Sequence, residues 1–430
     1  TYTYDPAGRR SSIKLPEGGT LAYEYDGNDN VTAITDPNRH TTTFTYNDTN
    51  ALISIKNAVN ATMEYKRDLL DRITEIKDWN GNKRTFIYDS LGRLSQEFNP
   101  LNGKTKYEYD AVSNLVKITD PLDRETSYEY NKARLLTKMI DAENAVTKYE
   151  YDGVGRLKLK IDGNEHTTSY SYDGNGNVNS VTDGNDKTTS YEYSPINLLS
   201  KKIDANNHAN IFEYDNNGRM TKTINPKGDF RRMVYDEVGN VMSEFDELGH
   251  AITHAYDKND RLITSIDRMD HRTGFEYDSA GNLTKRKDPK DNATAYEYDD
   301  VNRMIKEIDP TNQITTYGYD QNGNVATITD ALEHATLFEY NGLNQKTLIK
   351  NAQLHTATNT YNKAGELVSN TDFRGNEYAY KYDKLGRTER ITDPLEHSTS
   401  FVYDPVGNMI ERIAADTGKE QMVYDGANRL

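Results

Sequence analysis

A 21-residue repeat runs through the whole chain and constrains its fold more than any other feature. Steps of 21 from Tyr4 to Tyr424 meet tyrosine at 20 of 21 positions, Arg67 being the exception. We number each repeat from this tyrosine, position zero. The next residue is Asp 16 times and Asn four times, and an aromatic residue stands two before the tyrosine in 17 repeats. No insertion or deletion breaks this phase, so residues 1–430 are predicted to form a single continuous array without an internal domain boundary.

Proline, glycine and aspartate mark two turns in each repeat. All 11 prolines fall at +2 or +12, and position +4 is Gly 11 times. Position +11 is Asp or Asn in 18 of 20 repeats. These residue types favour turns, and glycine also adopts positive φ without steric cost. We therefore expect turns at +1 to +4 and +11 to +14, with positive φ at +4 glycines such as Gly155 and Gly323.

Two short arms, +5 to +10 and about +16 to zero, lie between the turns. In the second arm Tyr107 and Tyr109 alternate with Lys106 and Glu108. A period of two in Thr- and Tyr-rich segments indicates strands. The predicted fold class is all-β: a repeat array of about twenty antiparallel β-hairpins. Alternation also predicts that the zero tyrosines are more buried than the residues just before them, such as Glu24, Glu108, Glu129 and Glu297.

The second apolar residue of the first arm does not keep a constant position. It stands at +9 in some repeats and at +10 in others, and one residue of shift changes the face to which a side chain points. A β-bulge present in only some repeats would absorb the shift. The sequence leaves this open for two sets of residues: Ile34, Ile118, Ile328 and Ile391 at +9, and Ile140, Ile203, Ile266 and Ile308 at +10.

Such a strip must coil. Forty strands at about 4.8 Å spacing give a strip about 200 Å long and about 20 Å wide. Because neighbouring strands twist, the strip coils and turns one face inward. By this arithmetic it barely completes one turn around a cavity about 60 Å across. The two end strands would also be open edges. We therefore expect the remainder of the parent chain, or other copies of this chain, to join it edge to edge.

The composition narrows the classes of partner. The net charge is −16, which opposes nucleic acid or an anionic membrane as the main partner. The chain has no cysteine, hence no disulfide framework and no thiolate metal site. No apolar run reaches the roughly 20 residues that a membrane span requires.

The repeat unit resembles the signature of the Rhs, or YD-repeat, family. The resemblance is carried by Tyr151-Asp152-Gly153-Val154-Gly155-Arg156-Leu157, by Tyr382-Asp383-Lys384-Leu385-Gly386-Arg387, and by Thr392-Asp393-Pro394 followed by Tyr403-Asp404. It extends over the whole chain. The family includes bacterial polymorphic toxins, the Tc toxin shell, wall-associated proteins and teneurins.

The resemblance implies a β-hairpin strip that spirals into a hollow shell, and a secreted or cell-surface location. In the toxins of this family the shell encloses a C-terminal effector. This chain shows no variable effector tail and no plug. Asp404-Pro405-Val406-Gly407-Asn408 resembles the autocleavage segment of bacterial shells only weakly and falls in phase as an ordinary turn. Enclosure is thus implied for the parent protein.

No catalytic, cofactor-binding or metal-binding residues are predicted, and the chain is not expected to be an enzyme. Asp173-Gly174-Asn175-Gly176-Asn177 and Asp26-Gly27-Asn28-Asp29-Asn30 resemble the opening of a calcium loop. The Glu expected at the twelfth position is replaced by Gly184 in the first of them. Turn chemistry is the favoured interpretation of both. Arg67, which replaces a zero tyrosine, is interpreted as local variation.

Eight of the nine histidines occupy +15, and only His254 does not. A row of protonatable groups that loosens turns at pH 5–6 is one interpretation, and metal binding is another. The favoured interpretation is a turn-exit position that Asn, Asp, Lys and Arg also fill. The eight are His40, His166, His208, His250, His271, His334, His355 and His397.

Three functions are compatible with these features. The favoured one is a structural wall segment of a large Rhs-type shell that encloses a toxic effector polypeptide. The alternative is a cell-surface stalk or adhesin whose outer aromatic face binds glycans. A glycan-active enzyme is the least favoured. An effector encoded next to the repeats would favour the shell, and a surface anchor without an effector would favour the stalk.

Overall fold

The chain folds into one antiparallel sheet of short strands joined in sequence order. The computed structural model describes residues 1–416 and 418–430. These residues form 41 strands and no helix, each strand pairing with the next along the chain. The predicted all-β hairpin array is confirmed. No helix in the described part is long and apolar enough to cross a membrane.

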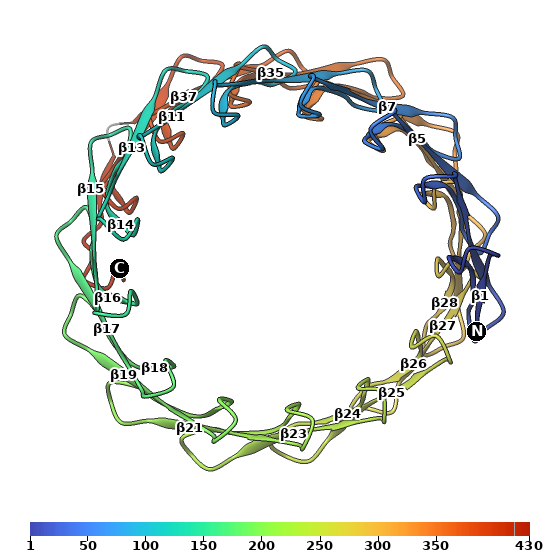
Figure 1. The fold of residues 1–430 in the computed structure, drawn as a ribbon, viewed down its shortest axis with the longest axis horizontal. Helices are drawn as coiled ribbons and strands as arrows, with labels where there is room; N and C mark the ends of the chain where they lie inside the picture. The colour runs from blue at the N-terminus through green and yellow to red at the C-terminus, as the bar shows by residue number, and fades with distance from the viewer. Residues whose placement is uncertain (417) are drawn as a thin grey trace.

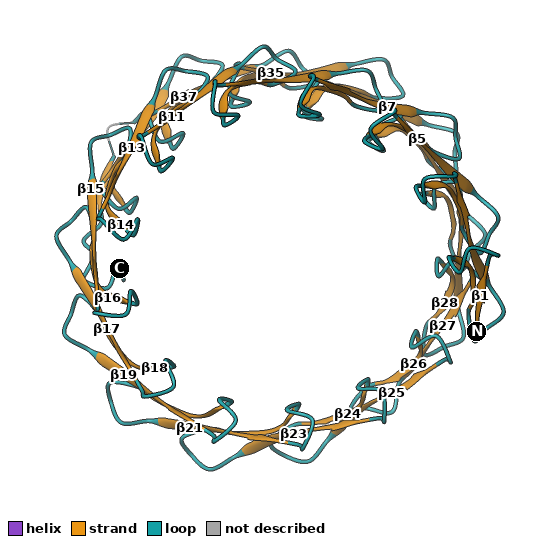
Figure 2. Cartoon of the chain, viewed as in Figure 1, coloured by secondary structure: helices purple, strands orange, loops and turns teal. Residues whose placement is uncertain are grey.

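The strands follow the repeat without exception between the chain ends. Even-numbered strands occupy +6 to +10, from β2 (Arg10–Lys14) to β40 (Met409–Ile413). Odd-numbered strands occupy +16 to the next zero tyrosine, from β3 (Thr20–Tyr25) to β39 (Ser398–Tyr403). Only the end strands β1 (Tyr2–Tyr4) and β41 (Lys419–Gln421) are shorter. Figure 2 shows strands forming the wall and turns projecting at its margins.

The two turns of each repeat have the same backbone. All positive-φ residues in the described part stand at +4 or +14. Gly155 (φ 89°) and Gly323 (φ 88°) confirm the prediction for +4. Many +14 positions are not glycine, as with Arg39 (φ 73°) and Leu354 (φ 68°), although bulky residues resist this region. The local hydrogen bonds described below hold them there.

A β-bulge occurs in every hairpin from β1–β2 to β39–β40, which decides the question that the sequence left open. Between β3 and β4 (Val31–Thr35), Tyr25 pairs with Val31 and Glu24 pairs with Ala33, so Thr32 is the extra residue. The same shift follows the zero residue in the other hairpins, as at Glu108/Tyr109 and Val402/Tyr403. Because the register is constant, isoleucines at +9 and +10 point to opposite faces. Those at +9 pair with the −2 aromatic, as Ile34 does with Tyr23.

The wall is one sheet thick and has almost no core. Among the described residues only Gly19, Ala33, Ala61, Gly103 and Thr119 are buried. The zero tyrosines from Tyr25 to Tyr424 are half-buried, whereas Glu24, Glu108, Glu129 and Glu297 are exposed, as alternation predicts. With so little burial, stability depends on lateral contacts between neighbouring strands and turns.

The strip coils into a hollow spiral that overlaps itself. In Figure 1 the orange and red C-terminal repeats lie over the same arc as the blue and teal N-terminal ones. Asn38, in the repeat of Tyr25, contacts Asp278, in the repeat of Tyr277, and these tyrosines are twelve steps of 21 residues apart. Twelve repeats therefore complete one turn, and the chain makes more than one and a half turns. The prediction of barely one turn was wrong.

Candidate functional surface: turn rows and the seam between wraps

Most turns are organised by the Asp or Asn that begins them. In the turn after Tyr25, Asp26 Oδ1 accepts hydrogen bonds from the backbone N–H of Asn28 (2.9 Å) and of Asn30 (3.0 Å). The N–H of Asp26 in turn donates to the carbonyl of Asn30 (3.0 Å). The turn that begins at Asp36 repeats this pattern with Asn38 and His40. The Asp or Asn at +1 and +11 therefore supplies the side chain that closes the turn.

Consecutive turns are tied together by the residue at +5. Where it is Arg, as in Arg93, Nε donates to Asp89 Oδ2 (2.7 Å) and Nη1 donates to the carbonyl of Asp110 in the next repeat (3.1 Å). The same guanidinium lies 4.6 Å from the ring centre of Tyr109. Where it is Asn, as in Asn282, the amide bonds to Asp278 and to Asn302 of the next turn (both 2.8 Å). Both solutions link one repeat to the next.

The tyrosine hydroxyls form a ladder along the wall. From Tyr25 onward each zero tyrosine donates to the carbonyl of the residue 15 before it, as Tyr172 does to Leu157 (2.7 Å). Leu157 pairs with Tyr151 of the preceding strand but has no paired residue on the following strand, where the ladder includes only +8 to +10. Burial raises the pKa of Tyr109 and Tyr298, which keeps these hydroxyls protonated as donors.

Arg67 performs the same task as the tyrosine it replaces. Its Nε donates to the carbonyl of Leu52 (3.1 Å), and its Nη1 donates to the carbonyl of Asp71 (2.7 Å). The interpretation of Arg67 as local variation is therefore incomplete, because the residue preserves the ladder contact by different chemistry.

Successive wraps meet through their turns, at the ends of the strands. We call the row of turns at +1 to +5 the +1 rim, the row at +11 to +15 the +11 rim, and their contact between wraps the seam. The amide of a +13 asparagine donates across the seam to the +1 aspartate. The three such bonds are Asn38 to Asp278 (2.9 Å), Asn80 to Asp320 (2.9 Å) and Asn164 to Asp404 (2.8 Å).

One ion pair crosses the seam with both partners well covered. Arg124 Nη1 donates to Glu366 Oε1 at 2.6 Å, with side-chain exposures of 16% and 15%. Arg124 also binds Asp120 in its own turn (2.5 Å) and the carbonyl of Asp383 (3.4 Å). Unlike the asparagine–aspartate contacts, this pair is not repeated elsewhere along the described seam.

Glycines make the close approach of the two wraps possible. A Cβ on Gly184 would overlap the carbonyl of Gly426, and one on Gly103 would overlap the carbonyl of Lys363. Both glycines lie in first-wrap turns and face second-wrap turns. In the +11 turn the residue with positive φ stands at +14, so the turn itself does not require glycine at +12 or +15. A glycine at either position was therefore the signal in the sequence for a close contact.

The +15 histidines stand where the chain leaves the +11 turns, and most contact the residue that begins the turn. In five of them Nδ1 lies 3.1–3.3 Å from the +11 carboxylate: His208, His250, His271, His334 and His397. His40 and His166 face the seam and are less exposed, and His40 Nε2 is 3.4 Å from Asp300 of the other wrap. His355 has an asparagine at +11 and donates its backbone N–H to it (2.9 Å). His254 lies in β25 (Ala251–Tyr256), opposite Ser265.

The two calcium-like segments are ordinary turns. Asp173 Oδ1 accepts the N–H groups of Asn175 and Asn177, and its Oδ2 accepts the amide of Asn177. The segment that starts at Asp26 is built in the same way. In the described part of the chain no cluster of His, Cys, Asp or Glu is arranged to hold a metal ion.

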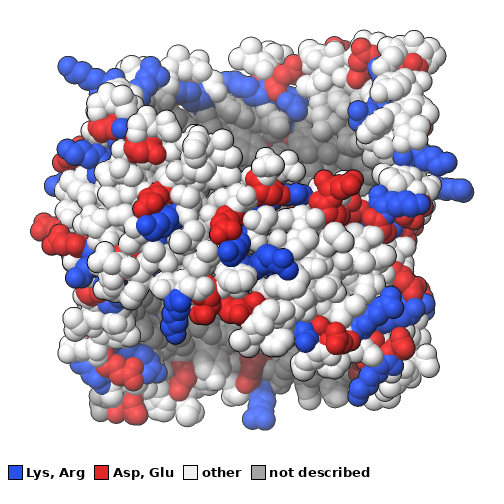
Figure 3. Space-filling model, turned by 90° about the horizontal axis from the view of Figure 1, so that it is seen from below, with Lys and Arg blue, Asp and Glu red and all other residues white. Residues whose placement is uncertain are grey.

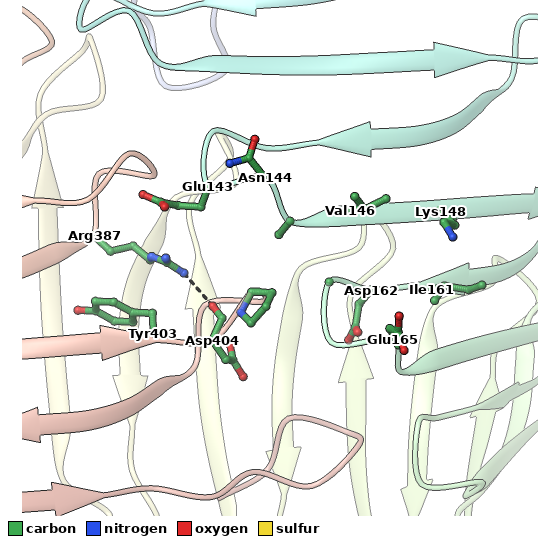
Figure 4. Close-up of a pocket in the computed structure, with 13 residues that line it drawn as sticks. Glu143, Asn144, Val146, Lys148, Ile161, Asp162, Glu165, Arg387, Tyr403 and Asp404 are labelled. Atoms are coloured by element: carbon green, nitrogen blue, oxygen red, sulfur yellow. Dashed lines mark hydrogen bonds between the residues drawn. The ribbon is translucent and has the colours of Figure 1, made fainter.

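The segment from Asp404 to Asn408 also forms a normal turn, and it lies in the seam. Its aspartate accepts hydrogen bonds from Val406, Asn408 and the opposing Asn164. A cavity of about 440 Å³ opens beside it (Figure 4). First-wrap residues Glu143 and Asp162 and second-wrap residues Arg387, Tyr403 and Asp404 line this cavity, so it is a notch in the seam.

Hydrogen bonding lowers the pKa of many turn carboxyls. The backbone N–H of Arg429 contributes most to holding the pKa of Asp425 down, at about 2. Donors in the turn likewise lower the pKa of Asp89 and Asp204, the largest contribution coming from a backbone N–H in each case. Across the face drawn in Figure 3, acidic and basic side chains are intermingled.

Comparison with known proteins agrees with this architecture. The model of the teneurin YD-shell matches residues 1–172 and 158–238, and that of the RHS repeat matches residues 256–293, 277–314, 298–335 and 382–419. A comparison with curated proteins gave no match.

The chain is also similar in fold to solved structures of Tc toxin proteins. The chain is similar to the crystal structure of TcdB2-TccC3, with a TM-score of 0.64 and 14% identity over 99% of this chain and 31% of that one. It is also similar to the Photorhabdus luminescens Tc holotoxin pore, with a TM-score of 0.65 and 13% identity over 99% of this chain and 30% of the other. The chain thus spans about a third of the length of these relatives.

Proposed function

Because this chain belongs to the family of Rhs and teneurin-type YD-shell proteins, we propose that it is a structural wall segment of a secreted or cell-surface shell that encloses a polypeptide effector. The observation that carries the proposal is the self-overlapping spiral. A strip whose rims bond to each other at the twelfth repeat makes a closed lateral wall around an open space (Figure 1).

Three features of the wall support this role. The seam uses side chains, backbone and close glycine contacts, so the wraps are joined along their length. The tyrosine hydroxyls and many tyrosine faces already have partners within the wall, as at Tyr109. The repeat and fold are those of structural shell repeats rather than of an enzyme.

The alternative is a surface stalk or adhesin that binds glycans. The row of zero tyrosines gives this alternative little support. Sugars would stack on free ring faces, but +5 guanidiniums cover rings such as those of Tyr88, Tyr172 and Tyr403 at 4.4–4.6 Å. The enclosing wall is therefore the favoured function.

Protease protection tests the proposal. An unstructured polypeptide with one cleavage site is fused after Leu430, which lies on the cavity side of the wall in Figure 1. The same fusion is made to a variant with Gly103→Val and Gly184→Val, which forces the wraps apart. Slower cleavage in the unmodified spiral than in the variant is expected, provided that both retain β-sheet circular dichroism. Equal cleavage rates in the two proteins would refute enclosure.

A further inference from the structure

Parts of the +1 rim and of the +11 rim lie outside the seam. They carry the same kinds of residue that are covered where the two rims meet in the seam. The seam joins the +11 rim of the repeats of Tyr4 to Tyr172 with the +1 rim of the repeats of Tyr256 to Tyr424, from Glu17–Lys258 to Asn185–Gly426. In the described part of the chain, the +11 rim of the later repeats and the +1 rim of the earlier repeats have no opposing rim; we call these the free +11 rim and the free +1 rim. Each is therefore a direct continuation of an established interface.

Exposed apolar side chains mark both free rims. At +3, Leu91 of the free +1 rim is 68% exposed, whereas Leu385 at the same position in the seam is 38% exposed. At +13, Leu395 of the free +11 rim is 75% exposed, whereas Leu122 at the same position in the seam is half-buried. Rows of large exposed apolar groups indicate a surface that is covered by a partner. Further members of these rows are Leu70, Val112, Val154, Ile196 and Val238 at +3, and Leu248, Met269 and Leu332 at +13.

The free +1 rim also keeps the glycines that the seam uses for close approach. In the seam, the +2 glycines Gly342 and Gly426 lie against Pro100 and Gly184 of the opposing wrap. On the free +1 rim, Gly153 and Gly174 stand at the same +2 position, and a Cβ on either would meet nothing within 4 Å. These positions leave room for another row of turns.

We propose that the free +11 rim of one molecule docks the free +1 rim of a second copy of this chain, by the contacts of the internal seam. A second copy that continues the spiral places its Tyr4 repeat against the Tyr193 repeat of the first. Asn206 at +13 then faces Asp5 at +1, the same pair of positions as Asn38 and Asp278. The contact is made by turns at the ends of strands, and the open strand edges at the chain ends take no part in it.

This docking is heterologous, since the two rims of a molecule differ. Each copy offers one rim of each kind, so the assembly is an open head-to-tail series. Eleven repeats of one copy would face eleven of the next in a continued spiral, against nine in the internal seam. The inference concerns the rims and not the enclosed space, so it is independent of the enclosure proposed above.

Sedimentation velocity on residues 1–430 tests the proposal. The wild-type chain should form species larger than a monomer that grow with concentration. Leu332→Asp places a charge on the free +11 rim, and Ile196→Asp places one on the free +1 rim. Each variant alone should remain monomeric. A mixture of the two should form dimers and nothing larger, because each molecule retains one competent rim of the opposite kind.

A matched control carries the same change away from both rims. Val402 lies on the sheet face at −1 and is 42% exposed, so Val402→Asp should leave the series intact. A wild-type chain that stays monomeric at every concentration overturns the proposal and shows that a different partner covers the rims. Loss of association in Val402→Asp, or failure of the two rim variants to pair when mixed, overturns it as well.

Discussion

Removing one tyrosine hydroxyl isolates the energetic contribution of the ladder. In Tyr172→Phe the ring remains, and with it the contact at 4.4 Å with the guanidinium of Arg156. The change removes only the 2.7 Å hydrogen bond to the carbonyl of Leu157. A hydrogen bond of this kind contributes about 1 kcal/mol net, and partial exposure lets water replace it to some extent. The expected loss is therefore about 0.5–1.5 kcal/mol, confined to the adjoining strands.

Amide hydrogen exchange measures this loss where it occurs. Local opening of β16 (Leu157–Ile161) and β17 (Thr167–Tyr172) should become about fivefold more frequent, since about 1 kcal/mol corresponds to that factor. Tyr4→Phe in residues 1–430 is the control, because the ladder hydrogen bonds of the described residues begin at Tyr25. Unchanged exchange in Tyr172→Phe, or an equal acceleration in Tyr4→Phe, would show that the hydroxyl ladder does not stabilise the wall.

Three further predictions address the turns and the seam. Gly155→Val should destabilise its hairpin by roughly 1–2 kcal/mol because a β-branched residue resists positive φ. Gly153→Val, two residues earlier, should have little effect, and urea titration compares the unfolding free energies of the two variants. Lowered carboxyl pKa values, about 2 for Asp425, contribute stability that is present above about pH 4 and lost as the pH falls towards about 2, as acid titration by circular dichroism should show. Arg124→Met alone should open the seam and raise the radius of gyration in small-angle scattering, and adding Glu366→Leu should reverse this, since a covered carboxylate without its cation is the costly state.

The wall could be predicted from the sequence because its determinants lie within one repeat. Spacing, turn residues and alternation fixed the strands, the positive φ at Gly155 and the greater burial of tyrosine than of Glu108. The sequence left open whether a bulge in some repeats brings the isoleucines at +9 and +10 to the same face. They do not share a face: Ile34 pairs with Tyr23, whereas Ile140 pairs with Ser127. The constant bulge increases local twist in every hairpin, which suits a strip that coils.

The seam could not be predicted in the same way. Its partners lie about 240 residues apart, and all repeats carry similar turns, so no spacing singles out which turns meet. Arg124 is an arginine at +15 and Glu366 a glutamate at +5, and neither position is unusual until the twelve-repeat turn brings them together.

Closure of the spiral therefore has two separate physical causes. The bulge and the twist recur in each repeat and set an approximate curvature. Because they are the same in all repeats, they do not determine which repeat of one wrap faces which repeat of the next. A seam shifted by one repeat would still place +11 turns against +1 turns, and its asparagine–aspartate bonds would partly re-form. Among the described seam contacts the Arg124–Glu366 pair does not recur, whereas closely approaching glycines recur at +12, as at Gly163 and Gly184, and at +15, as at Gly19 and Gly103. Substitutions at position zero should hence change how stable the wall is, whereas substitution of Arg124 or Glu366 should change how many repeats complete a turn, and with it the width of the enclosed space.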